Sequence, residues 1–260
     1  MKWQPDSRTC IDPISKMTRR NTITLTILSL ILAASLTANV LTFRKARGYY
    51  LQLHAIRLDP LGLGAFPNAS PAMLPPAIVF FGDSRARQWP APDGWKGATI
   101  VNRGIGNQTT AQVLGRFPQH VASLKPGLVV LQVGVNDLKT IPLFPSEKEK
   151  IVRNCQANIA RLVRDAVESG SRVVVTTIMP LGKVPIERRP FWSDDVATAI
   201  KEVNATITAM GGERVSVFDT GQILAGPDGT VDPKYSRDLL HLQPEGYAAL
   251  NRAIAPLLAP

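Results

Sequence analysis

Two segments far apart in the chain carry side chains that together could activate a nucleophile. Asp238 and His241 stand three residues apart, so the carboxylate can hold the imidazole and leave its second nitrogen free to take a proton. Ser84 ends the sequence Gly82-Asp83-Ser84, and a serine hydroxyl attacks well only when such a base lies within hydrogen-bond reach. Alone, Gly-Asp-Ser is also good turn chemistry and Asp-x-x-His is commonplace. We expect chemistry at Ser84 only if the fold brings both segments together.

Alternating strand-like and helical segments provide elements that can do this. Short runs rich in Val and Ile predict strands that are covered on both faces, as in a parallel sheet. The predicted strands are Ala77–Phe81, Thr99–Asn102, Leu128–Val133, Arg172–Thr177 and Val215–Phe218. Apolar residues at the 3.6-residue period predict helices from Ser146 with a capping box, from about Ser193 to Met210, and from Gln243. The pattern predicts a doubly wound α/β sandwich with a five-stranded parallel sheet, whose ligands bind beyond the carboxyl ends of the strands.

Four motifs follow one another in the order of these elements, and together they resemble a known family. They are Gly82-Asp83-Ser84, the stretch Asn102–Thr110, Gly134-Val135-Asn136-Asp137 and Asp238-x-x-His241. This set resembles the SGNH (or GDSL) hydrolases, in particular the branch of the catalytic subunits of platelet-activating-factor acetylhydrolase. The resemblance covers about Ala77 to Leu258 and leaves the N-terminal part unexplained.

The resemblance implies a serine esterase on a flavodoxin-like three-layer sandwich, with no metal and no cofactor. Ser84 would be the nucleophile, His241 the general base and acid, and Asp238 its orienting partner. The oxyanion hole would use the backbone N–H groups of Ser84 and Asn107 and the side-chain amide of Asn136. Such donors accelerate a reaction because they already point to where negative charge develops.

Two neighbours of these motifs are expected to be structural. Asp137 fits a helix cap or loop acceptor better than a catalytic acid. His120 lies in a predicted helix without a nearby acid. One departure from the family concerns Asn107, where related enzymes have a glycine followed by Asp-Thr. A backbone N–H does not depend on the side chain, and Asn is the non-glycine residue that best tolerates a left-handed conformation.

The N-terminal part predicts a membrane anchor. Ile23–Phe43 is apolar and free of charge, and a helix of this length covers the roughly 30 Å of a bilayer core. Of the net charge of +10, residues 1–57 contribute 9 basic and 2 acidic side chains, or +7, so most of the excess flanks this segment. The rest of the sequence has no basic stripe with interleaved aromatic residues, so we do not expect nucleic-acid binding.

From these features we predict four regions. They are a polar basic tail (1–21), a transmembrane anchor (22–43), a tether rich in Pro and Gly (44–76) and the hydrolase domain (77–260). A cleaved signal peptide is the main alternative for the anchor. We expect a single-pass membrane protein with the catalytic domain outside the cytoplasm, although basic residues on both sides of the span leave its orientation open.

The expected substrate is an ester with a short acyl group, such as acetyl, on an extracytoplasmic glycan or lipid. The segment after the fourth strand offers candidate substrate contacts: Arg188 and Arg189 for an acidic group, and Phe191 and Trp192 for an acyl or sugar pocket. One alternative from another class is a non-hydrolytic domain that binds an envelope polymer or transfers acyl groups to it. A second is a lysophospholipase or thioesterase. Acyl length, leaving group and oligomeric state are not readable from the sequence.

Overall fold

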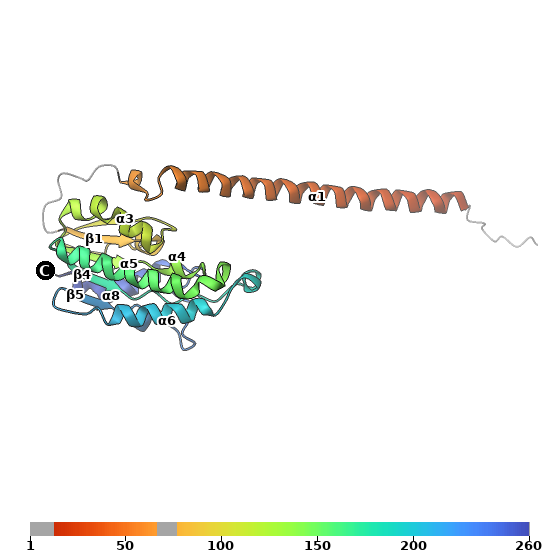
Figure 1. Ribbon diagram of the computed structural model, residues 1–260. Coiled ribbons are helices and arrows are strands. Elements are labelled where there is room, and N and C mark those ends of the chain that lie inside the picture. Colours follow the sequence, from red (N-terminus) through yellow and green to blue (C-terminus); the bar gives the residue numbers. More distant parts are fainter. Residues whose placement is uncertain (1–12, 67–76, 260) are drawn as a thin grey trace, which may run out of the picture. The chain divides into compact units, whose positions relative to one another are not determined.

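The computed structural model describes residues 13–66 and 77–259, with side chains from residue 18 onward, in two compact units that divide between Leu58 and Asp59 (Figure 1). The second unit holds a single parallel sheet of five strands in the order β2-β1-β3-β4-β5. The strands are β1 (Ala77–Gly82), β2 (Thr99–Gly104), β3 (Leu128–Gln132), β4 (Arg172–Thr176) and β5 (Val215–Phe218). This is the flavodoxin-like strand order, and all five predicted strands are confirmed to within two residues at each end.

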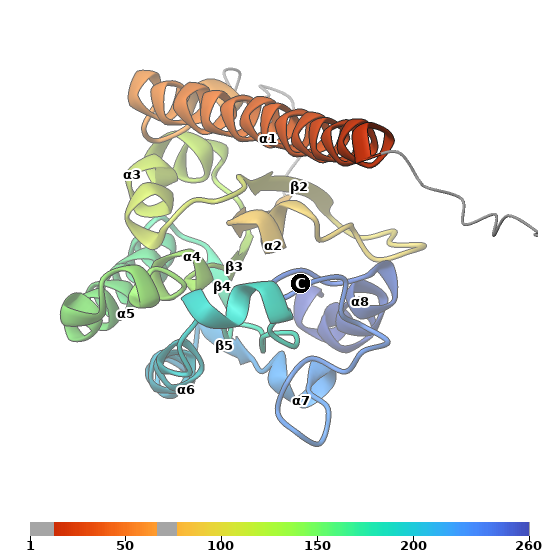
Figure 2. The same ribbon diagram turned by 90° about the vertical axis from the view of Figure 1, so that its right-hand side faces the viewer.

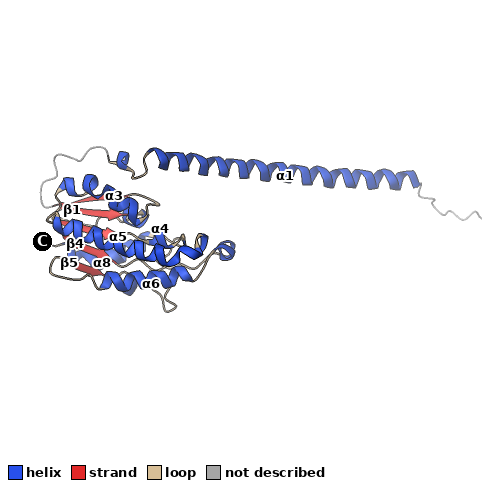
Figure 3. Cartoon of the chain, viewed as in Figure 1, coloured by secondary structure: helices blue, strands red, loops and turns tan. Residues whose placement is uncertain are grey.

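Helices cover both faces of the sheet (Figures 2 and 3). They are α2 (Ser84–Arg87), α3 (Thr110–His120), α4 (Val135–Leu138), α5 (Lys148–Glu168), α6 (Asp195–Thr208), α7 (Gly221–Leu224) and α8 (Pro244–Leu258), with 3-10 turns at η1 (Leu63–Ala65), η3 (Ile141–Leu143) and η5 (Ile186–Phe191). Successive strand residues point to opposite faces. Val79 and Phe81 therefore pack with α3, α5 and α6, whereas Ile78 and Phe80 pack with α7 and α8. The result is the predicted three-layer sandwich.

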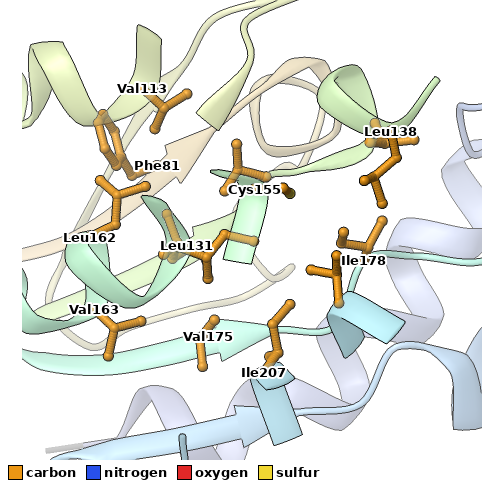
Figure 4. Packing of buried hydrophobic residues seen from close by; sticks show 14 of the residues in the cluster. Phe81, Val113, Leu131, Leu138, Cys155, Leu162, Val163, Val175, Ile178 and Ile207 are labelled. Carbon is orange, nitrogen blue, oxygen red and sulfur yellow. The ribbon is translucent and has the colours of Figure 1, made fainter. Parts of the chain in front are cut away.

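The core on the α3, α5 and α6 face fixes how the long helices sit on the strands (Figure 4). Phe81 of β1 and Leu131 of β3 meet Val113 of α3 and Leu162 of α5, all at most 2% exposed. Cys155 of α5 is completely buried in this cluster, and burial raises the pKa of its thiol. The strand ends that carry the sequence motifs are thus rigidly held.

Two helix starts differ from the sequence prediction. The capping box expected at Ser146 is absent, because residues Pro145–Glu147 form a 3-10 turn and α5 begins at Lys148 without a side-chain cap. A capping box instead begins α3, where Thr109 and Gln112 satisfy each other's backbone N–H groups. Lys148 forms an ion pair with Asp195 of α6 at 2.5 Å, so tertiary contacts govern the start of α5.

The first unit consists of helix α1 (Pro13–Leu58), which extends beyond the predicted span at both ends. Residues 13–21 of the predicted polar basic tail are helical and continue into the predicted span, while residues 1–12 lie outside the described part. Residues Thr18–Leu58 are long and apolar enough to cross a membrane, and large apolar side chains of this helix, such as Leu30 and Phe43, are exposed. A signal sequence meets the same description.

The predicted tether over 44–76 is also not uniform. It is helical to Leu58, and residues 59–66 belong to the second unit. Gln108 donates from Nε2 to the carbonyl of Leu61 at 2.8 Å, and Gln112 donates from Nε2 to the carbonyl of Pro60 at 2.8 Å. Glycine and proline made this stretch resemble a linker, but its carbonyls are held by polar side chains of the domain. The predicted residues 67–76 lie outside the described part.

Candidate active site

Ser84, His241 and Asp238 meet at the carboxyl edge of the sheet, which faces the viewer in Figure 2. Ser84 is the first residue of α2, directly after β1, and the other two precede α8. Ser84 Oγ lies 3.0 Å from Nε2 of His241, and Nδ1 of the same ring lies 3.0 Å from both Oδ1 and Oδ2 of Asp238. Ser84 and His241 are 157 positions apart in the sequence, and the fold brings their side chains within hydrogen-bond distance.

The carboxylate of Asp238 organises the loop as well as the ring. Its Oδ1 accepts from the backbone N–H of Leu240 at 2.8 Å and of His241 at 2.9 Å. Partial burial would raise the pKa of Asp238, but these hydrogen bonds and the contact with the imidazole outweigh it and hold that pKa below its ordinary value. An ionised carboxylate on Nδ1 favours the tautomer that keeps its proton there, so Nε2 can accept from the serine hydroxyl.

A tight turn presents Ser84 at this edge. Gly82 has a φ of +147°, and a Cβ at this position would lie 1.7 Å from the carbonyl oxygen of Gln132, so only glycine fits. Asp83 then caps α2 by accepting the backbone N–H of Arg85 at 2.8 Å. Asp83 is completely buried, and this burial raises its pKa to about 6 despite the nearby positive charge of Arg85.

The three predicted oxyanion donors follow the ends of β1, β2 and β3: Ser84 begins α2, Asn107 lies in the turn before α3, and Asn136 lies in α4. Asn107 has a φ of +64° and is one of two non-glycine residues with a left-handed backbone in the described part of the chain. Asn136 is 3% exposed and donates from Nδ2 to the carbonyl of Gln108 at 3.0 Å. The amide of Asn136 has a second N–H, and its bond to Gln108 ties the loop after β3 to the loop that carries Asn107. Their catalytic roles remain predictions.

Two residues near these loops are structural, as predicted. Asp137 accepts the backbone N–H and the hydroxyl of Thr110 at 2.9 and 2.6 Å, which caps α3 from a neighbouring loop. His120 is 1% exposed and lies 3.3 Å from the carbonyl of Leu63 through Nε2. Burial lowers its pKa. Neither contacts Ser84 in the described structure.

The sequence analysis missed two buried arginines that brace the site. Arg116 is 0% exposed and donates to the carbonyls of Gly82 and Arg103 at 2.7 and 2.8 Å, which joins the end of β1 to that of β2. Burial lowers its pKa to about 9. Arg85, directly after Ser84, is 1% exposed. An arginine in a turn or on a helix is ordinarily exposed, so no local signal distinguishes these two.

The predicted substrate segment forms η5, and its four candidate residues lie in different surroundings. Arg188 and Phe191 are exposed, Phe191 to 77%. Arg189 and Trp192 line a cleft of about 560 Å³ together with Leu181 and Asp194. Trp192 also packs against the core. The segment therefore does not form one acyl pocket over Ser84.

Arg188 lies within electrostatic reach of a second cation near the oxyanion residues. Lys139 ends α4, three residues after Asn136, and is half-buried. Burial lowers the pKa of Lys139, and the positive charge of Arg188 lowers it further. No ion pair neutralises Lys139 or Arg188 among the described residues. Lys139 and Arg188 thus place two cations on this side of the site, with the buried carboxyl of Asp83 as the nearby opposite charge.

Comparison with known proteins places this architecture among established relatives. The family model described as "GDSL-like Lipase/Acylhydrolase family" matches residues 79–249. Platelet-activating factor acetylhydrolase IB subunit alpha1 of Rattus norvegicus is 27% identical over 190 residues, which cover 70% of this chain and 75% of the relative.

Two solved structures share the fold. A GDSL-like lipase from Bacteroides thetaiotaomicron superposes with a TM-score of 0.60 at 24% identity, over 76% of this chain and 96% of its own. A catalytic mutant of an acetylxylan esterase from Geobacillus stearothermophilus gives a TM-score of 0.50 at 19% identity, over 74% and 98% of the two chains. Fold, motif order and site geometry all lead to the same family.

Proposed function

Because the chain belongs to the GDSL-like lipase/acylhydrolase family and is therefore an ester hydrolase, we propose that it uses Ser84, His241 and Asp238 as a catalytic triad. The observation that carries this proposal is the continuous contact from Ser84 Oγ through both ring nitrogens of His241 to Asp238, each step at 3.0 Å. The test is hydrolysis of a short-chain aryl acetate by the full chain, with variants at the three positions.

In the proposed reaction, His241 Nε2 takes the hydroxyl proton while Ser84 Oγ bonds to the acyl carbon. The carbonyl electrons move onto oxygen, and the tetrahedral intermediate collapses when the alcohol leaves with the proton from Nε2. Water then attacks the acyl-enzyme in the same way, and the carboxylic acid departs as Ser84 regains its proton. Asp238 stabilises the imidazolium in both steps without taking the proton.

The developing oxyanion would bind the backbone N–H groups of Ser84 and Asn107 and the amide of Asn136. Asn136→Ala should lower kcat by about 10²–10³ and leave KM nearly unchanged, because this donor acts on charge that exists only in the transition state. The measurement is steady-state hydrolysis of an aryl acetate. Asn158→Ala is a matched control, since its Nδ2 bonds the hydroxyl of Thr110 at 3.0 Å and it should retain kcat. A folded Asn136→Ala enzyme with kcat within about threefold of wild type would exclude this role.

We propose that the acyl group is acetyl and that the ester is carried by an extracytoplasmic glycan. Both an acetylhydrolase and an acetylxylan esterase are among the proteins similar to this chain, and the second acts, by its name, on a glycan. The half-buried Lys139 and the exposed Arg188 favour an acidic glycan. Complementary charge raises the local concentration of such a substrate.

If the cations of η5 bind the substrate, their removal should weaken the binding of an anionic glycan, whereas the removal of cations elsewhere on the surface should not. We expect Arg188→Ala/Arg189→Ala to raise KM several-fold for acetylated anionic glycans and to leave neutral acetylated glycans unchanged, with the difference shrinking as salt screens the attraction. The measurement is a substrate panel at low and high ionic strength. Lys150→Ala/Arg153→Ala is the control, because these exposed cations on α5 pair with Glu147 and Glu149. An unchanged preference in the η5 variant would contradict electrostatic selection.

A lipid ester is the second candidate substrate, and a specific observation favours it. In the described part of the second unit, the exposed large apolar side chains lie at or beside η3 and η5, the turns that follow α4 and β4. They are Leu143, Phe144, Ile186 and Phe191, exposed by 56–77%. Exposed apolar patches mark surfaces that meet lipids or partners. Phospholipid and lysophospholipid esters therefore belong in the same panel.

We propose that α1 anchors the protein in a membrane with the hydrolase unit outside the cytoplasm. The length and apolar composition of Thr18–Leu58 support a span. A domain that transfers acyl groups to an envelope polymer, or only binds one, is the rival function on this fold. Product analysis with and without an acceptor polymer separates hydrolysis from transfer, and a pure binding module should hydrolyse none of the panel.

A further inference from the structure

The side chain that follows the proposed nucleophile points into the protein and binds two other loops. Arg85 donates from Nε to the carbonyl of Leu240 at 2.6 Å, from Nη1 to that of Met179 at 2.9 Å and from Nη2 to that of Pro180 at 3.3 Å. All three acceptors are backbone oxygens. Leu240 belongs to the loop of the histidine, whereas Met179 and Pro180 begin the loop after β4. One guanidinium thus joins three separate segments of the carboxyl edge.

These contacts close a ring around the reacting atoms. Ser84 and Arg85 are linked by a peptide bond, as are Leu240 and His241. Two hydrogen bonds complete the ring, from Arg85 Nε to the Leu240 carbonyl and from Ser84 Oγ to His241 Nε2. A displacement of the histidine loop away from α2 must therefore break the bond to Arg85. The separation of nucleophile and base depends directly on this side chain.

Arg85 and Leu240, the residues next to the reacting side chains, are each held at both their backbone N–H and their carbonyl. The N–H of Arg85 donates to Asp83 Oδ1 at 2.8 Å, and its carbonyl accepts from the hydroxyl of Tyr247 at 3.2 Å. The N–H of Leu240 donates to Asp238 Oδ1 at 2.8 Å, and its carbonyl accepts from Arg85. Supporting hydrogen bonds of this kind hold catalytic groups within the narrow range of productive geometry. The side chain of Arg85 therefore joins two firmly held backbone segments, one on each side of the Ser84–His241 contact.

A buried arginine is an unfavourable choice if only stability matters. Arg85 forms no ion pair within the described part of the chain, although the charge of Asp83 is nearby. Taking a guanidinium out of water is costly, and the three carbonyls and the nearby Asp83 offset only part of that cost. We propose that Arg85 is a positioning residue, which holds the Leu240 carbonyl so that His241 stays within reach of the Ser84 hydroxyl. This inference rests on the proposed function of Ser84 and His241.

The test is Arg85→Met in the full chain, because methionine fills a similar volume without donors. We expect kcat for an aryl acetate to fall by about 10- to 100-fold with KM within about threefold of wild type, since small misplacements of a catalytic group have effects of this size. Labelling of Ser84 by a fluorophosphonate should slow by the same factor, because it reports activation of the nucleophile without a bound substrate. The midpoint of thermal unfolding should fall, because three backbone carbonyls and the carboxyl of Asp83 lose their partner, so kcat is measured per folded molecule below the transition.

Two further variants keep the result interpretable. Ser171 lies just before β4, at the opposite edge of the sheet, and its buried hydroxyl donates to the carbonyl of Pro126 at 2.8 Å. Ser171→Ala should therefore lower stability without changing kcat per folded molecule. Arg85→Lys keeps the charge and reaches fewer carbonyls, so its kcat should fall between those of wild type and Arg85→Met. If Arg85→Met does not fold, Arg85→Lys decides the question.

Wild-type kcat and labelling rate in a folded Arg85→Met or Arg85→Lys variant would overturn the positioning role. Failure of the proposed function gives a different result. In that case the wild-type chain itself neither hydrolyses the ester nor reacts with the fluorophosphonate at Ser84.

Discussion

Ser84→Ala should lower the hydrolysis of a short-chain aryl acetate by at least about 10⁴ in kcat. Without Oγ there is no acyl-enzyme, and neither His241 nor the oxyanion donors replace a covalent intermediate. The residual rate would come from binding and oxyanion stabilisation alone. The measurement is steady-state turnover by purified full-length protein, corrected for spontaneous hydrolysis of the ester.

The fold should survive this change, because Asp83 caps α2 through the backbone of Arg85 and not through the serine side chain. Ser236→Ala is the matched control. Its hydroxyl donates to the carbonyl of Asp238 at 3.0 Å in the same loop system but does not reach the histidine ring, so turnover should change by less than about threefold. Undiminished turnover in Ser84→Ala would show that the reaction takes place elsewhere.

Asp238→Asn should have the second-largest effect, a loss of about 10⁴ in kcat. The asparagine can still accept the N–H groups of Leu240 and His241 through its oxygen, so the loop keeps its shape. Its amide nitrogen then faces Nδ1 of the ring, which favours the tautomer protonated on Nε2. That nitrogen can no longer take the proton of Ser84, and the rate falls although all residues are in place.

A comparison within the same loop separates this effect from general disruption. Asp232→Asn changes a half-buried carboxylate that accepts the backbone N–H of Lys234 at 3.0 Å and has no hydrogen bond to the histidine. We expect Asp232→Asn to retain nearly full kcat. A near-normal rate in Asp238→Asn, with the same unfolding midpoint as wild type, would remove Asp238 from the mechanism.

The sequence predicts the strands from local signals, and it suggests the residues of the proposed triad through the order of the motifs that follow those strands. A continuous apolar run such as Ala77–Phe81 indicates a buried strand, and a turn that follows it lies at the carboxyl edge of a parallel sheet. Gly82 illustrates the same point, since its φ of +147° is one that side chains rarely adopt. The order of four such turns was therefore enough to predict which side chains share one edge.

Features that depend on contacts between distant segments were not predictable in this way. Arg85 and Arg116 look like ordinary surface residues, and only the tertiary fold supplies the carbonyls that bury them. Residues 59–66 look like a linker because of their Gly and Pro, but the side chains that hold them come from α3 and the loop before it. Likewise, tertiary packing and not the local sequence determines the start of α5.

The most direct test of the triad is to identify the residue that a fluorophosphonate modifies. Treatment of the full-length protein, digestion and mass spectrometry of the peptides should give one adduct, on Ser84, formed at a rate that drops sharply in Asp238→Asn. The adduct should be absent from Ser84→Ala. An unmodified wild-type protein that still hydrolyses the ester, or an adduct on a different residue, would contradict the assignment of Ser84 as the nucleophile.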